Sequence, residues 1–244
     1  GYAMLMADEY PQSEINYNEA TKYKLSKKWS FQYARGYREH KQYLRAEWMY
    51  QNILNYFRHD KAAGLEFARM ELDDLANYER AEEICRREIL DYHINDADGI
   101  MLLGDIFLEW GTEKDPEMLE KAREQYATLI QLYKPNLLYQ SRMMRYFIRT
   151  DNLRNVLQLK ELFLPKEKNL SAEDWTELSG YLMDKLYGPL APSDEYLRTE
   201  IEDVRMMLLR AVKLDPKNPI ATYNLSRYFI ETNEPNAAKE SLVS

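Results

Sequence analysis

The chain has 244 residues, of which 45% are apolar and 30% charged, the balance of an ordinary soluble protein. Its net charge of −8 argues against the basic footprint that nucleic-acid binding requires, and its single cysteine, Cys85, excludes an intramolecular disulfide or a zinc site built from cysteines. No apolar run approaches the length of a membrane span, and residues 2–7 lack the basic flank of a signal peptide. We therefore expect no nucleic-acid partner and no direct membrane insertion in this segment, while the compartment, cytoplasmic or periplasmic, stays open.

The N-terminal segment, residues 1–26, contains one predicted helix. Tyr17 and Ala20 have the spacing of a helix that packs on a neighbour, whereas Pro11 interrupts any helix before it. We expect a capping helix over residues 13–26, because the end of a helical array needs an element that covers its apolar face. Only 8 glycines and 9 prolines occur in the whole chain, which favours helices over tight hairpins.

From residue 27 onward the sequence predicts helices in repeating pairs. Small residues return where the second helix of a pair would cross the first, at Ala46, Ala81 and Ala122. In the fourth pair two places of close helix contact hold larger residues, Met144 on the first helix and Val156 on the second. The looser packing expected there leaves room for a local bend. The repeats start near residues 27, 62, 97, 137, 172 and 219, and the last is incomplete.

The pattern is clearest near the C-terminus, where Asn218 caps a helix whose first turn contains Pro219. Small or apolar residues then follow at the places of close helix contact: Leu225, Ser226, Phe229 and Ala238. This stretch resembles the tetratricopeptide-repeat (TPR) family, whose unit of about 34 residues folds as two helices. The resemblance implies an all-α fold, a TPR-like helix-turn-helix solenoid over residues 27–244 that forms a right-handed superhelix of about six repeats.

No residue pattern in the chain is typical of an enzyme, a metal site or a cofactor site. The segment from Asp96 to Gly99 resembles part of a calcium loop, but Ile94 stands where the first ligand would be. The insert at residues 188–200 has hydroxyl side chains but no histidine to activate them. We expect a non-catalytic protein without cofactor or metal.

In the TPR family the first helix of each pair lines a concave groove, and the resemblance places candidate partner contacts on those helices. Arg142, Arg145 and Arg149 share one helical face in a block, residues 135–170, whose 7 basic and 3 acidic side chains give a net charge of +4. One hypothesis makes them a basic patch for an acidic partner; the other pairs them with Asp105, Glu109 and Asp184. The full set of candidates is Phe31, Arg35, Arg38, Arg142, Arg145, Arg149, Tyr223, Asn224 and Arg227.

The sequence thus predicts a protein–protein interaction scaffold that presents a concave groove to a partner peptide, helix or domain. The alternative is a structural segment of a larger bacterial assembly, such as a cell-envelope or flagellar-motor scaffold, which contacts its neighbours through its ends and convex face.

Overall fold

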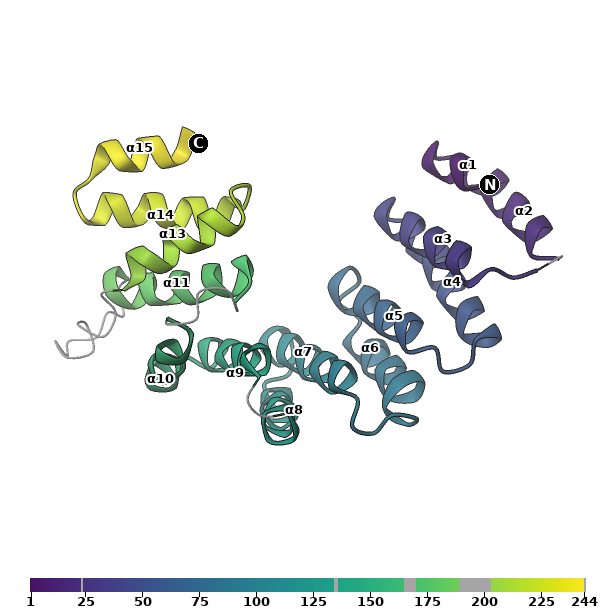
Figure 1. The fold of residues 1–244 in the computed structure, drawn as a ribbon, viewed down its shortest axis with the longest axis horizontal. Helices are drawn as coiled ribbons and strands as arrows, with labels where there is room; N and C mark the ends of the chain where they lie inside the picture. Colours follow the sequence, from purple (N-terminus) through teal and green to yellow (C-terminus); the bar gives the residue numbers. More distant parts are fainter. Residues whose placement is uncertain (23, 134–135, 165–169, 189–202, 244) are drawn as a thin grey trace. The chain divides into compact units, whose positions relative to one another are not determined.

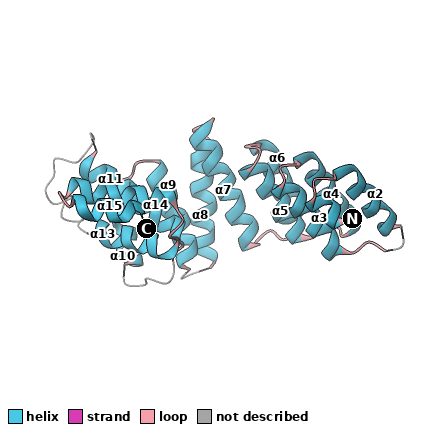
Figure 2. Cartoon of the chain, turned by 90° about the horizontal axis from the view of Figure 1, so that it is seen from above, coloured by secondary structure: helices cyan, strands magenta, loops and turns pink. Residues whose placement is uncertain are grey.

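The computed structural model describes residues 1–22, 24–133, 136–164, 170–188 and 203–243. Every regular element within these ranges is a helix (Figures 1 and 2), which confirms the all-α prediction. Nearly all of the insert at residues 188–200 lies outside the described residues.

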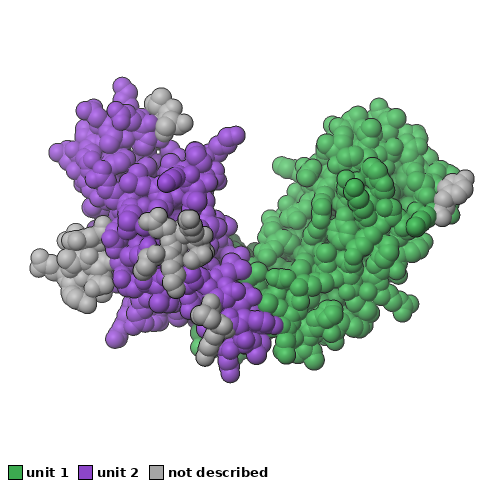
Figure 3. Space-filling model, viewed as in Figure 1, with its two compact units in different colours: residues 1–125 green, residues 126–244 purple. Residues whose placement is uncertain are grey.

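The chain forms two compact units, Gly1–Gln125 and Tyr126–Ser244 (Figure 3). The helices of the first unit are α1 (Tyr2–Met6), α2 (Tyr10–Thr21), α3 (Lys27–Glu39), α4 (Tyr43–Tyr56), α5 (Lys61–Asp73), α6 (Tyr78–Cys85), which continues as the π-helical turn η1 (Arg86–Leu90), and α7 (Ala97–Glu113). Helix α8 (Met118–Leu132) begins in the first unit and ends in the second. The second unit continues with α9 (Leu137–Arg149), α10 (Leu153–Phe163), α11 (Ala172–Tyr187), α13 (Val204–Leu214), α14 (Pro219–Glu231) and α15 (Pro235–Val243).

Within each unit the helices pack as successive pairs, which can be followed in Figure 1. In the first unit α1 packs on α2, α3 on α4 and α5 on α6. In the second, α9 packs on α10, α11 on α13 and α14 on α15, and α11 also contacts the first helices of both neighbouring pairs, α9 and α14. Each pair therefore buries its apolar face mainly against its neighbours, as in a solenoid. The assignment of these pairs to six repeats stays a prediction.

The first helix of each pair from α3 onward begins at a side-chain cap. In the first unit the capping residues are Ser26, Asp60 and Asp96; in the second they are Asn136, Ser171 and Asn218. Each side-chain oxygen accepts a hydrogen bond from a backbone N–H in the first turn, where no helical carbonyl is available. The caps therefore fix where these helices start, and two of the three in the first unit are carboxylates whereas those of the second are uncharged.

In five helix pairs the turn from the first to the second helix is closed by a residue with positive φ, whereas α7 ends at Lys114 with φ −132°. Five such residues occur, none of them glycine, with φ between 47° and 62°: Asp8, Lys41, Ala76, Asp151 and Asn233. The residue that follows donates its N–H back into the last turn, as Gln42 does to the Tyr37 carbonyl at 2.8 Å and Asn152 to that of Phe147 at 2.8 Å. This is the geometry of a Schellman cap, which usually contains glycine at that place. The sequence therefore gave no glycine signal for these turns.

The core contains the small and aromatic residues that the repeat pattern assigned to packing. Ala46 and Ala81 are fully buried, and so are Tyr37 and Tyr50. In the second unit Met144 and Val156, the larger residues of the fourth pair, are also fully buried and belong to one cluster with Trp175, Phe163 and Leu178. The longer side chains are thus accommodated in the core.

The N-terminal residues form two helices instead of one. The predicted capping helix over 13–26 lies at Tyr10–Thr21, with Pro11 in its first turn, where a missing N–H costs nothing. Helix α1 precedes it and packs on α3 through Leu5, which is fully buried. Gly36 of α3 permits this approach, because a Cβ there would lie 2.8 Å from the Leu5 Cδ2 atom.

Candidate interaction surfaces

Ion pairs connect the first helices of successive pairs in the first unit. The Arg35 guanidinium on α3 binds both carboxylate oxygens of Glu66 on α5, at 2.9 Å and 2.5 Å. Arg38 donates to Asp74, which follows α5, and Arg69 of α5 lies 3.2 Å from Asp105 of α7. The two-point contact of Arg35 is the geometry in which a guanidinium holds a carboxylate most specifically.

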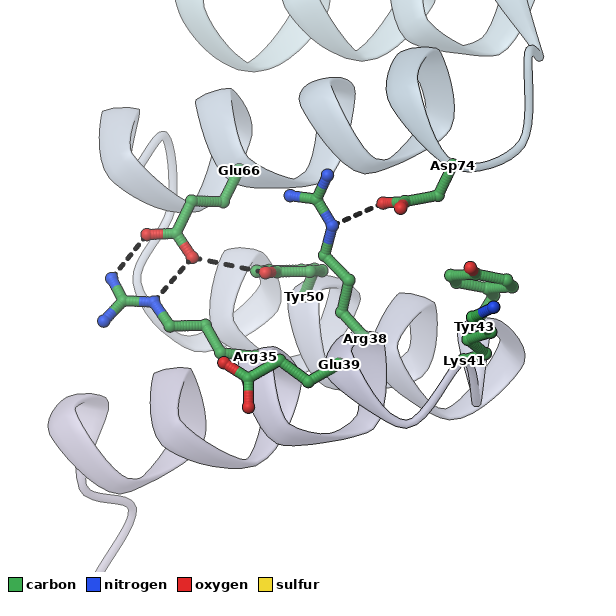
Figure 4. Close-up of a pocket in the computed structure, with 8 residues that line it drawn as sticks. All are labelled: Arg35, Arg38, Glu39, Lys41, Tyr43, Tyr50, Glu66 and Asp74. Carbon is green, nitrogen blue, oxygen red and sulfur yellow. Dashed lines mark hydrogen bonds and ion pairs between the residues drawn. The ribbon is translucent and has the colours of Figure 1, made fainter. Parts of the chain in front are cut away.

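Two of these pairs, Arg35–Glu66 and Arg38–Asp74, line an open pocket of about 520 Å³ between α3, α4 and α5 (Figure 4). The ring of Tyr50 lies between the two arginines in this view, and its hydroxyl donates to Glu66 at 3.2 Å. Burial, together with the nearby Glu66 carboxylate, raises the pKa of Tyr50, so the phenol stays protonated. The remaining lining residues are Arg38, Glu39, Lys41, Tyr43 and Asp74, so that both signs of charge face the opening.

In the second unit the pairs that connect α9 to α11 are centred on a largely buried arginine. Arg145 of α9 contacts three carboxylates of α11: Glu173 at 3.1 Å, Asp174 at 3.0 Å and Glu177 at 3.3 Å. Its side chain is only 15% exposed. Burial alone would lower the pKa of Arg145, but the carboxylates of Asp174, Glu173 and Glu177 outweigh it and raise the pKa. The guanidinium therefore acts as an internal cross-link between α9 and α11.

The other two arginines of α9 lie beside this network. Arg149 is 3.3 Å from Glu177, and Arg142 is half-buried. The three carboxylates around Arg145 are not among the intramolecular partners that the sequence suggested, because the packing of α9 on α11 brings Glu173, Asp174 and Glu177 within its reach. A role of these arginines toward another protein stays a proposal.

Helix α14 carries an exposed apolar stripe. Ile220, Tyr223 and Ile230 are 62%, 62% and 64% exposed, and their spacing along the helix places them on one face. Arg227 lies on the same face and binds Asp184 of α11 at 2.5 Å. Large apolar side chains that gather on a surface around a polar group are typical of interaction sites.

Two of the predicted contact residues are buried. Phe31 is only 7% exposed, and the guanidinium carbon of Arg35 lies 5.3 Å from the centre of its ring. Asn224 is also 7% exposed and faces Gly180 of α11, where a Cβ would lie 2.9 Å from its amide nitrogen. Both residues therefore differ from the expectation of partner contacts, because a neighbouring side chain or helix covers them.

A signal for the cross-helix pairs was present in the sequence. Arg35 and Glu66 are 31 residues apart, and Arg38 and Asp74 are 36 apart, which is close to one repeat of about 34 residues. Residues one repeat apart stand side by side when the pairs stack. Basic and acidic residues at this separation could therefore have been matched before the structure was known.

The acidic residues of the segment that resembles a calcium loop make contacts within the protein. Asp96 caps α7, and Lys61 binds both Asp96 and Asp98, at 2.6 Å and 2.8 Å. Cys85 is fully buried, which raises the pKa of its thiol to about 12.

The described residues contain no group of three or more histidine, cysteine or acidic side chains that could hold a metal ion. Among the same residues no helix has the length and apolar character needed to cross a bilayer.

Comparisons with known proteins give little beyond the fold. No protein-family model matches the chain, and no curated protein matches it. Among solved structures, the chain is similar to that of YrrB, described as a TPR protein with an unusual peptide-binding site, with 14% sequence identity. The match covers 79% of this chain and 88% of that one, with a TM-score of 0.44. A likeness at this level supports no inference about binding in this chain.

Proposed function

We propose that the chain is a non-catalytic scaffold that binds a segment of another protein against the exposed face of α14. The stripe formed by Ile220, Tyr223 and Ile230 carries this proposal, because it leaves three large apolar side chains in contact with water. Each of them would gain about 1 kcal/mol or more if a partner covered it. Tyrosine and arginine are also the residue types that most often dominate binding at protein interfaces.

The charges around the stripe indicate the form of the partner. Arg227 forms an ion pair with Asp184, whose side chain is 66% exposed. The exposed face of α14 therefore combines apolar side chains with one ion pair whose charges neutralise each other. Such a surface fits a helix or an extended peptide with apolar residues at the spacing of the stripe and a polar border. On this proposal the sequence candidates Tyr223 and Arg227 are partner contacts, and Arg35, Arg38, Arg142, Arg145 and Arg149 chiefly hold neighbouring helices together.

Site-specific photo-crosslinking tests the proposal. A photoreactive phenylalanine replaces Tyr223 in the full chain, in the cells that produce it, and a matched variant carries it at Tyr92, which is 54% exposed in the first unit. We expect a single dominant protein adduct at position 223 and none of that protein at position 92. Combining the label with Ile220→Ser and Ile230→Ser should reduce the adduct about tenfold or more, since the two isoleucines are the large apolar contacts on either side of position 223.

The thermal melt of the Ile220→Ser, Ile230→Ser protein serves as the control and should be unchanged, because both side chains are exposed. Absence of a specific adduct at position 223, or an adduct that survives both substitutions, would refute the proposal. Adducts to several different proteins at both positions would instead support a structural segment of a larger assembly.

A further inference from the structure

A second pocket opens in the first unit where α1, α2 and α3 meet. Its volume is about 290 Å³, and it shares no lining residue with the pocket of Figure 4. The side chains that give it its character are Tyr2, Tyr17, Lys24, Ser26, Trp29 and Tyr33. The volume is near the lower end of ligand pockets, about 300 Å³, so it suits one large side chain rather than a folded domain.

The floor of this aromatic pocket is fixed by contacts within the unit. Tyr17 and Tyr33 are each 5% exposed, and their ring centres lie 4.9 Å apart. The Tyr17 hydroxyl is 2.8 Å from the Ser30 hydroxyl, which in turn donates to the Ser26 carbonyl at 3.0 Å. A floor held in this way presents ring faces without having to rearrange, which lowers the entropic cost of binding.

Trp29 is the exposed wall of the pocket. It stands in the first turn of α3 and is 52% exposed, whereas Tyr33, one turn further along the same helix, is buried. The exposed half of the Trp29 indole therefore lies beside buried rings, and a further aromatic ring could pack against it. Aromatic pairs of this kind attract each other beyond the effect of the area they bury.

The described lining of the pocket carries a positive charge. Lys24 is the one charged side chain among the described residues that line it, and it is exposed; Lys28, which precedes Trp29 on α3, is also exposed but lies outside the lining. The structure shows no ion pair to either lysine from any described residue. In a protein with a net charge of −8, this rim therefore attracts carboxylates rather than basic groups.

We propose that the aromatic pocket docks an aromatic side chain of an acidic segment in a partner protein. The ring would enter between Trp29 and the tyrosine floor, and flanking carboxylates would meet Lys24 and Lys28. This surface lies in a different unit from the α14 stripe, so the two proposals stand or fall separately.

Three blocked pentapeptides test the chemistry: Glu-Glu-Phe-Glu-Glu, Glu-Glu-Ala-Glu-Glu and Lys-Lys-Phe-Lys-Lys. The readout is the set of indole N–H signals in the NMR spectrum of the full chain, which has four tryptophans. The Trp29 signal is assigned by its loss in Trp29→Phe. We expect the acidic phenylalanine peptide to shift the Trp29 signal alone, with half-saturation below about 1 mM. The other two peptides should bind at least about tenfold more weakly, and raising the salt should weaken the first peptide several-fold.

Two variants place the binding at the pocket. Lys24→Glu should weaken the acidic peptide about tenfold, because it turns an attraction into a repulsion. Trp29→Ala should do the same by removing a wall; because this variant lacks the reporting indole, its peptide affinity is measured by isothermal titration calorimetry beside the original chain. Leu44→Ala on α4, at a position 83% exposed, is the matched control and should leave affinity unchanged. The proposal is overturned if no indole signal shifts, if the alanine or lysine peptide binds equally well, or if Lys24→Glu binds the acidic peptide as tightly as the original chain.

Discussion

Arg35–Glu66 in the first unit and Arg145–Asp174 in the second each connect neighbouring first helices, yet the first pair is exposed and the second is buried. In the first unit the Arg35 side chain is 55% exposed and that of Glu66 is 27% exposed, and the pair lines an open pocket. In the second unit the Arg145 side chain is 15% exposed and that of Asp174 only 4%. Both pairs have the same sequence feature, an arginine about one repeat before an acidic residue. This feature corresponds to a surface ion pair in the first unit and to a buried one in the second.

The comparison shows what each unit leaves available to a partner. The first unit turns charged pairs toward the solvent, and charged pairs in water contribute little to stability and can be exchanged for others. The second unit buries the Arg145–Asp174 pair between α9 and α11 and exposes the apolar stripe of α14. Recognition by the first unit should therefore depend on salt, and recognition by the second mainly on apolar contact.

Removing the arginine from each kind of pair should separate the two units most clearly. Arg145→Ala leaves Asp174 and Glu177 largely buried without their main partner and should cost about 3 kcal/mol, near the low end for such changes because Arg149 remains beside Glu177. Arg35→Ala should cost less than about 1 kcal/mol. Urea unfolding of the full chain, followed by far-UV circular dichroism, measures both. Equal losses would show that the two pairs do not differ in the way their burial indicates.

Overpacking the helix crossings should affect both units alike. Ala81 of α6 is fully buried and Ala238 of α15 is 5% exposed, so Ala81→Leu and Ala238→Leu should each cost about 1–3 kcal/mol in the same unfolding experiment. Ala122 of α8, also fully buried, should behave in the same way. Ala127→Leu, at an exposed position of α8, is the control and should be neutral. Three neutral results at the buried positions would mean that the crossings are placed wrongly.

Acid should weaken the Asp96 cap of α7 in the first unit, whereas the first helices of the second unit have uncharged caps. Burial alone would raise the pKa of Asp96, but hydrogen bonds from Lys61 and the Gly99 amide outweigh it and lower the pKa. Because the folded-state pKa is lowered, its stabilising effect is complete above the unfolded value of about 4 and is lost as the pH falls through the folded value. We expect Asp96→Asn to cost about 1 kcal/mol at neutral pH and progressively less in acid.

The matched measurement for this pH dependence is Asn218→Ser. Both side chains cap without a charge, so the effect of that exchange on the free energy of unfolding should not vary with pH. A constant difference between Asp96→Asn and the original chain down to the most acidic sample would contradict the role of the Asp96 charge.

The smallest effect concerns the residues of positive φ between helices. Ala76 has φ 47°, a conformation that glycine adopts without strain, so Ala76→Gly should stabilise the first unit by about 0.5 kcal/mol. Asp151 in the second unit has φ 54°, but its carboxylate also accepts hydrogen bonds from Tyr181 at 2.8 Å and Lys185 at 2.9 Å. Asp151→Gly should therefore bring no gain. A rise in the melting temperature for both variants would mean that those hydrogen bonds contribute nothing.

The sequence by itself determined that the chain is helical, and it indicated packing residues such as Ala81 and Ala238 and the Asn218 cap. These are local properties, since capping needs only the next few residues and the spacing of apolar residues reveals which side chains share a helical face. The five turns with positive φ were not visible in the same way, because Asp, Lys, Ala and Asn occupy the place where glycine would have signalled them.

Only the tertiary structure decided which of the shared faces stays open. Phe31 and Tyr223 both lie on faces that the sequence assigned to a partner, yet Phe31 is covered by Arg35 and its surroundings while Tyr223 remains 62% exposed. Likewise, the sequence placed Arg145 on a helical face but did not show its three acidic neighbours on α11. The period of a helix fixes the direction of a side chain about its own axis, whereas burial and ion pairing depend on the next helix, which lies about one repeat away in the sequence and is positioned by packing.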